Sequence, residues 1–156
     1  MLKQSNQFGP LKGLEYQKNL ERLAFTAGGR TQTAPAQRLV DFVDGKLSAN
    51  LNETSYQPGL NSAPMHSLLP KLIGSRLRKG FEAFGRKMHG YYTNEANIVG
   101  VESRTSSPVN IPRKENLEHP EIEGLFPCGE GGGYAGGIVS AAMDGERCAE
   151  AAIELL

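Results

Sequence analysis

The sequence predicts a mixed α/β fold that is rich in helix, and three observations lead to this class. Several long segments carry apolar residues at helical spacing. Two short segments, residues 97–102 and 109–111, are rich in β-branched residues. Near the C-terminus, a glycine-rich turn separates a short apolar run from a helix built on small residues.

Composition sets limits on size, location and partners. The chain has 156 residues, 38% of them hydrophobic and none of them tryptophan, so we expect one domain or a piece of a larger one. Lysine plus arginine equals aspartate plus glutamate at 17 each, which gives no basic footprint for nucleic acid. No apolar run reaches the roughly 20 residues of a membrane span, and the N-terminus lacks a signal-peptide core. We therefore expect a cytoplasmic location.

The first half of the chain reads as three helices and a loop. Apolar spacing predicts a helix over residues 10–27, ended by Gly28 and Gly29. A second helix is expected to start at Thr33, Ala34 and Pro35 and to end at Gly45. Residues 48–64 are predicted to form a loop.

The third predicted helix, residues 67–88, is the longest. Pro70 is acceptable in its first turn, and Gly74 or Gly80 could break it. Its polar face carries a basic cluster, which is read either as a contact for phosphate or as a solvated face; its members are Lys71, Arg76, Arg78, Lys79, Arg86 and Lys87.

The C-terminal third contains the stretch with the clearest functional pattern. Residues 125–128 are expected to end a buried strand, and residues 137–155 form a predicted helix with many alanines. Between them lie Gly129, Glu130, Gly131, Gly132, Gly133, Tyr134, Ala135 and Gly136. A glycine turn before a helix N-terminus brings backbone N–H groups close to an electron-rich ligand. Gly136, Gly137 and Ile138 would supply such groups from the first helical turn.

Three side chains have both a functional and a structural interpretation. Glu130 could accept hydrogen bonds from the hydroxyls of a sugar-like chain on a nucleotide cofactor, or it could be an exposed loop acid. Arg104, in a run of hydroxyl residues, could hold a carboxylate or phosphate, or satisfy loop carbonyls. Cys128 could be a redox thiol or a small buried residue, and Cys148 is expected to be packed. The histidines and cysteines show no metal-ligand spacing.

Two motifs resemble a known family. They are Gly-Val-Glu-Ser-Arg-Thr-Ser-Ser-Pro-Val at 100–109 and Gly-Leu-Phe-Pro-Cys-Gly-Glu-Gly-Gly-Gly-Tyr-Ala-Gly-Gly-Ile at 124–138, extended by Ser-Ala-Ala-Met-Asp-Gly at 140–145. They resemble the C-terminal part of bacterial FAD-dependent dehydrogenases of the NAD(FAD)-utilising type. Departures fall at Cys128, where the family usually has another small residue, and at Asn110, where it tends to have a basic one.

The resemblance implies the C-terminal portion of a Rossmann-like FAD/NAD(P)-binding flavoprotein about three times longer. Residues 1–96 would be mainly helical and belong to a substrate-side insertion, and residues 97–156 would complete the FAD domain. The N-terminal part of the chain contains no strand–GxGxxG–helix unit, so an N-terminal ADP-binding half would be the partner of this chain. Glu130 would hold the ribityl hydroxyls, Gly136 to Ile138 would face the flavin, and Arg104 would line the pocket.

Three functions are open on the sequence alone. The first is an oxidoreductase module that supplies the ribityl and isoalloxazine side of a FAD site, with an unnamed substrate and NAD(P)H as a candidate partner. The second is a non-catalytic module that binds a nucleotide or phosphate, and the third is a fragment that folds without cofactor. The chain alone is expected to bind FAD weakly or not at all, to be inactive, and to self-associate through surfaces meant for the missing half. No residue is recognisable as a catalytic acid or base.

Overall fold

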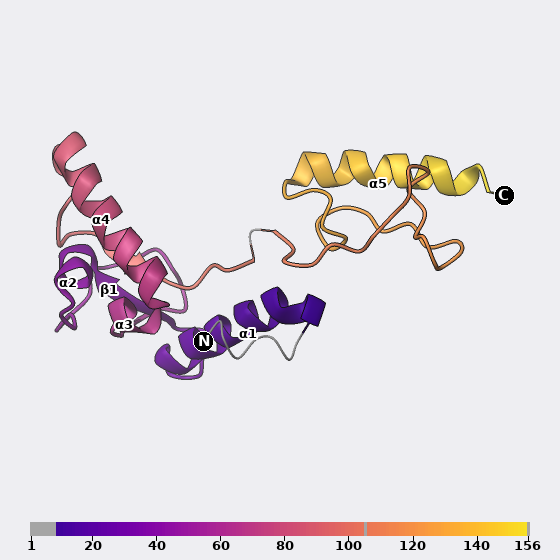
Figure 1. The fold of residues 1–156 in the computed structure, drawn as a ribbon. Coiled ribbons are helices and arrows are strands. Elements are labelled where there is room, and N and C mark those ends of the chain that lie inside the picture. The colour runs from indigo at the N-terminus through magenta and orange to yellow at the C-terminus, as the bar shows by residue number, and fades with distance from the viewer. Residues whose placement is uncertain (1–8, 105, 156) are drawn as a thin grey trace. The chain divides into compact units, whose positions relative to one another are not determined.

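The computed structural model describes residues 9–104 and 106–155, which form two compact units (Figure 1). The terminal unit comprises Met1–Lys18 and Ser103–Leu156, and the central unit comprises Asn19–Glu102. Helix α1 (Lys12–Ala27) contributes its first part to the terminal unit and its second part to the central unit. The predicted division into residues 1–96 and 97–156 concerns domains of a longer protein, and it stays a prediction.

A small mixed sheet lies in the central unit. Strand β1 (Ala34–Arg38) is its middle strand and pairs in parallel with β2 (Leu60–Ser62) and antiparallel with β3 (Asn97–Val99). The register places Ala34 opposite Leu60 and Ala36 opposite Val99. This sheet and its helices confirm the mixed α/β class, while the Rossmann-like part of the prediction stays untested.

Strand β1 corrects the expected second helix. Helix α2 (Leu39–Asp44) begins only after the strand, although Gly45, with φ of 73°, ends it as predicted. The apolar residues that suggest one helix belong in fact to a strand followed by a helix. Three consecutive residues of β1 are buried, so the strand lacks the alternation of buried and exposed residues that would reveal it in the sequence. Buried Gln37 stays hydrogen-bonded, since its side chain donates to the Lys46 carbonyl and accepts from the His66 N–H at 3.1 Å.

The long predicted helix is divided at Pro70, not at either glycine. Helix α3 (Met65–Leu68) ends at Leu69, whose backbone is extended, and α4 (Lys71–Lys87) begins after Pro70. A residue before proline is sterically excluded from the helical region, which explains why the break falls here. Gly74 is buried inside α4, where a β-carbon would make an ordinary contact at 3.5 Å from the His66 carbonyl oxygen.

The apolar core of the central unit is compact. Leu20, Phe42, Met65 and Leu69 form its buried cluster, and Phe81 of α4 packs against it. Phe42 and Phe81 meet edge to face, with ring centroids 5.9 Å apart.

Within its described residues, the terminal unit has one long helix besides the start of α1. Helix α5 (Ile138–Ile153) matches the predicted C-terminal helix closely. Residues 125–128 and 109–111 are irregular, so both of these strand predictions were wrong. A membrane crossing would need a longer and more apolar helix than any in the described ranges.

Candidate functional site

The residues Gly129 to Tyr134, called the glycine loop below, form a compact turn that closes on itself. The Tyr134 N–H donates to the Gly129 carbonyl at 3.0 Å, and the Gly133 N–H donates to the Glu130 carbonyl at 3.0 Å. The Gly132 N–H donates back to the Cys128 carbonyl at 3.3 Å. These bonds pair backbone groups of the loop and of Cys128 with one another. The segment 125–128 is not a strand and provides no ladder of hydrogen bonds for them.

Two of the loop glycines are required by the loop's own geometry. Gly129 and Gly133 have φ of 64° and 84°, in the left-handed region that disfavours other residues. A β-carbon at Gly133 would also lie 2.6 Å from the Val109 carbonyl oxygen. Gly131 differs, since its β-carbon would meet no described atom within 4 Å. Gly131 is therefore the loop glycine whose backbone is open to an approaching molecule.

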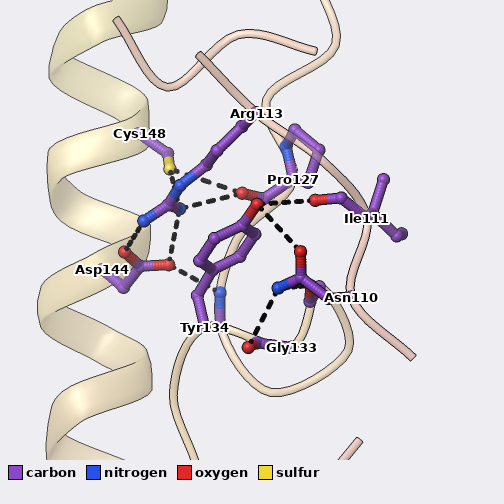
Figure 2. Close-up of polar contacts among 10 residues, drawn as sticks. Asn110, Ile111, Arg113, Pro127, Gly133, Tyr134, Asp144 and Cys148 are labelled. Carbon is purple, nitrogen blue, oxygen red and sulfur yellow. Dashed lines mark hydrogen bonds and ion pairs between the residues drawn. The ribbon is translucent and has the colours of Figure 1, made fainter. Parts of the chain in front are cut away.

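An ion pair fastens the glycine loop to α5. Arg113 donates from Nη2 to Asp144 Oδ1 at 2.7 Å and from Nη1 to Asp144 Oδ2 at 3.0 Å (Figure 2). Asp144 Oδ2 also accepts the Gly129 N–H at 2.9 Å, and Arg113 Nη1 donates to the Pro127 carbonyl at 3.0 Å. The Arg113 guanidinium, followed by the Gly129 N–H, lowers the pKa of Asp144 to about 2. The carboxylate is thus charged at neutral pH.

Tyr134 completes this cluster from the other end of the loop. The Arg113 guanidinium carbon lies 3.6 Å from the centroid of the Tyr134 ring, a cation–π contact (Figure 2). The Tyr134 hydroxyl donates to the Ile111 carbonyl at 2.7 Å. Asn110 donates to the Gly133 carbonyl at 3.2 Å, so the side chain that departs from the family pattern contacts the loop itself.

The two cysteines differ in exposure. Cys128 is exposed, which corrects the expectation of a small buried residue at the end of a strand. Cys148 is buried as expected, and burial raises the pKa of its thiol. Its sulfur lies 3.4 Å from Arg113 Nη1, so the packing of Cys148 belongs to the same cluster. Across the described residues, histidine, cysteine and acidic side chains nowhere gather in threes that could hold a metal ion.

An open groove of about 350 Å³ brings together predicted site residues from distant parts of the sequence. Glu130 and Gly131 line it on the loop side, and Arg104 lines it from the hydroxyl-rich segment. The remaining lining residues are Leu14, Gln17, Ser106, Ser107 and Pro108. The groove therefore offers a carboxylate, a guanidinium and hydroxyls around a small apolar floor.

The start of α5 lies outside this lining. Among the described residues that line the groove, Gly136, Gly137 and Ile138 do not appear, nor do Gly132 and Gly133. The Gly137 N–H donates to the Ser140 hydroxyl at 3.2 Å, so it is engaged within the helix start. Ala135 is also engaged, donating to the Gly129 carbonyl at 3.3 Å. Ile138 is 92% exposed, as expected of a residue at an open helix start.

Sequence reasoning missed the residues that hold the loop, Arg113 and Asp144. The charged segment 113–123 reads in the sequence as a surface connection, yet the Arg113 side chain is only 11% exposed. A signal existed on α5, because Asp144 stands four residues before Cys148, on the buried face of the helix. An acid on such a face needs a partner, but the sequence does not say which cation provides it.

Comparison with known proteins identifies the family. Residues 2–105 match the family described as FAD-dependent protein, C-terminal domain-like. This match covers most of the chain, which therefore belongs to that family. The glycine loop and α5 lie beyond the matched residues.

One relative shows that such sequences occur within longer chains. An uncharacterized protein of Clostridium beijerinckii is 42% identical over 147 residues, which make up 93% of this chain and 28% of that protein. The chain thus spans less than a third of the relative's length. Because this alignment takes in 93% of the chain, it reaches past residue 105 into the segment that the family match leaves out.

Proposed function

We propose that the chain is the C-terminal portion of a FAD-dependent oxidoreductase of the dehydrogenase type. In this proposal, it supplies the side of the cofactor site that faces the ribityl chain and the isoalloxazine ring. Family membership supports the cofactor class. The observation that carries the proposal is the groove in which Glu130, Gly131 and Arg104 meet.

The groove residues have chemistry that suits a hydroxylated chain. The Glu130 carboxylate can accept hydrogen bonds from neighbouring hydroxyls, and charged acceptors make the stronger bonds. Gly131 lets the backbone approach, because no described atom occupies the space of its missing side chain. A bare phosphate would be repelled by Glu130, so the groove favours the ribityl portion over a phosphate.

The helix start has a separate proposed role. The first turn of α5 has a partial positive charge, and Ile138 there is exposed. In this proposal, Gly136, Gly137 and Ile138 would face the pyrimidine edge of the ring, where that partial charge would favour negative charge on the ring. When bound, FAD supplies the hydride chemistry, and the residues of this chain bind and orient it.

The partner in this proposal is an N-terminal half that binds the ADP portion. The length of the relative supports such a half, since most of that protein lies outside the aligned segment. Exposed apolar side chains along α5 suit a contact with further chain; they are Ile138, Val139, Met143 and Ile153. The same side chains are the basis for expecting self-association of the chain alone.

A chimera tests the cofactor assignment. This chain replaces the aligned segment of the Clostridium beijerinckii protein, and visible flavin absorbance is measured on the chimera, on the intact relative and on this chain alone. We expect bound FAD in the first two and little in the third. A relative and chimera that both purify without flavin would refute the FAD function. Stoichiometric FAD in the chain alone would refute the need for a second half.

Glu130→Ala in the chimera tests the site. Loss of a charged hydrogen-bond acceptor should weaken FAD binding about tenfold, measured by flavin fluorescence titration. Glu123→Ala is the matched control, because Glu123 is also an exposed acid of the terminal unit. Equal FAD affinity in the two variants would remove Glu130 from the site.

A nucleotide- or phosphate-binding module is the second candidate, favoured by Arg104 and the hydroxyls of Ser106 and Ser107 in the same groove. Titration of the chimera with ADP and with inorganic phosphate separates the two functions. Under the FAD proposal, inorganic phosphate does not displace FAD, and Glu130→Ala leaves ADP affinity unchanged because ADP binds to the N-terminal half. Tighter phosphate binding in Glu130→Ala, with no flavin bound, would favour the module.

A further inference from the structure

The Arg113–Asp144 pair is too buried to be explained as a surface contact. The side chains are 11% and 9% exposed, and two hydrogen bonds join them. Withdrawing both charges from water is costly, and a buried pair often adds little to stability over an apolar replacement. The presence of this buried pair is better explained by the groups that it orients.

The groups that the ion pair orients are backbone groups at the N-terminal end of the glycine loop. Asp144 accepts from the Gly129 N–H, and Arg113 donates to the Pro127 carbonyl, two residues earlier. Both bonds involve a charged partner and a backbone group, so they resist the sliding of this segment along α5. The pair therefore determines where the loop begins relative to the helix.

The last residue of the loop is held by the same guanidinium. Tyr134 packs its ring against Arg113 at 3.6 Å and anchors its hydroxyl on Ile111 at 2.7 Å. Two of the four intervening residues, Glu130 and Gly131, are exposed and line the groove. The loop is thus held at both ends, and the exposed residues lie between these ends. This arrangement is expected where a short segment is presented to a ligand.

We propose that Arg113, Asp144 and Tyr134 are positioning residues that hold Glu130 and Gly131 toward the groove. Ligand affinity then depends on this cluster, although none of its three members lines the groove. The inference rests on the proposed function for the identity of the ligand as FAD. The ordering of the loop by the three residues does not depend on the identity of the ligand and can be tested on this chain alone.

Three substitutions separate the contacts of the cluster. Asp144→Asn removes the charge, Tyr134→Leu removes the ring, and Tyr134→Phe keeps the ring while removing the hydroxyl. Glu150→Gln is the control, because Glu150 is an exposed acid on the same helix. Amide hydrogen exchange by NMR is measured on the 156-residue chain, and FAD dissociation constants and visible circular dichroism of bound flavin are measured on the chimera.

We expect Asp144→Asn and Tyr134→Leu to speed exchange of the Gly129 and Tyr134 amides about tenfold or more, with exchange in the central unit unchanged. Both variants should weaken FAD binding about tenfold and alter the flavin dichroism. Tyr134→Phe should retain most of the affinity, because the ring contact with Arg113 persists. Glu150→Gln should match the unsubstituted protein.

Each other outcome overturns a defined part of the inference. Unchanged exchange at Gly129 and Tyr134 in both Asp144→Asn and Tyr134→Leu would refute loop ordering. Faster exchange with unchanged FAD affinity and dichroism would refute the positioning role while leaving the proposed function intact. If the relative and the unsubstituted chimera both purify without FAD, the proposed function and the FAD part of this inference are refuted. The exchange data would still decide whether the cluster orders the loop.

Discussion

The central and terminal units are stabilised by different kinds of contact. Among the described residues, every buried apolar side chain except those of Pro127 and Cys148 belongs to the central unit. The terminal unit instead buries Asp144 and Glu118, and its loop is joined to α5 through Arg113. Apolar packing tolerates small adjustments, whereas charged hydrogen bonds require particular atoms at particular distances.

This difference suggests a division of roles. The central unit has a sheet and an apolar cluster that can sustain a fold through burial of surface. The terminal unit has long irregular segments, and its order depends on a few polar contacts that converge on the glycine loop. We therefore expect the central unit to respond most to loss of volume and the terminal unit to loss of geometry or charge.

The largest effect is expected for Phe42→Ala in the central unit. Phe42 is fully buried and contacts Phe81, so removing its ring should cost about 4 kcal/mol of the free energy of unfolding. Urea denaturation followed by circular dichroism measures the change. Leu72→Ala is the control, because Leu72 is 60% exposed and its loss should cost less than about 1 kcal/mol. Similar costs for the two variants would show that the apolar cluster does not dominate this unit.

Gly133→Ala should have the next largest effect, confined to the terminal unit. The left-handed φ and the close Val109 carbonyl both oppose a methyl group, at a combined cost of about 3 kcal/mol. Gly131→Ala is the matched control, since its methyl group meets open space. NMR amide exchange in α5 and the loop reports local stability. Equal protection in the two variants would contradict the geometric requirement at Gly133.

The smallest expected effect is the pH dependence contributed by Asp144. Its folded-state pKa of about 2 lies below the ordinary 3.8, so the stabilisation is fully present above about pH 5 and is lost as the pH falls through 2. The contribution is about 2 kcal/mol. Unfolding is compared in the unsubstituted chain and in Asp144→Asn between pH 2 and pH 6. The stability difference should shrink as the pH falls, and a constant difference would show that the carboxylate is not the titrating group.

Much of the regular structure could be predicted from local pattern. Helices α1 and α5 and the end of α2 at Gly45 follow from apolar spacing and from a glycine at a left-handed position. The break at Pro70 does not follow from the helical pattern, because proline is also common in the first turn of a helix. It arises because Pro70 disfavours a helical backbone at the preceding residue, Leu69.

The site was only partly accessible to sequence reasoning. Glu130, Gly131 and Arg104 were predicted as site residues, and they line one groove, although their roles in binding stay predictions. The cluster that holds the loop was not predicted, because Arg113 and Asp144 are separated by 31 residues and follow no shared periodicity.

The sequence by itself determined the helices with strong apolar spacing and the places where glycine permits a left-handed backbone. Those features depend on neighbours within a few residues, so local pattern suffices. Only the tertiary structure decided that residues 34–38 are a strand and residues 125–128 are not. A strand exists only when another segment supplies its hydrogen bonds, as β2 and β3 do for β1. For the same reason, only the folded chain shows that Asp144 of a buried ion pair accepts the Gly129 N–H at the start of the glycine loop.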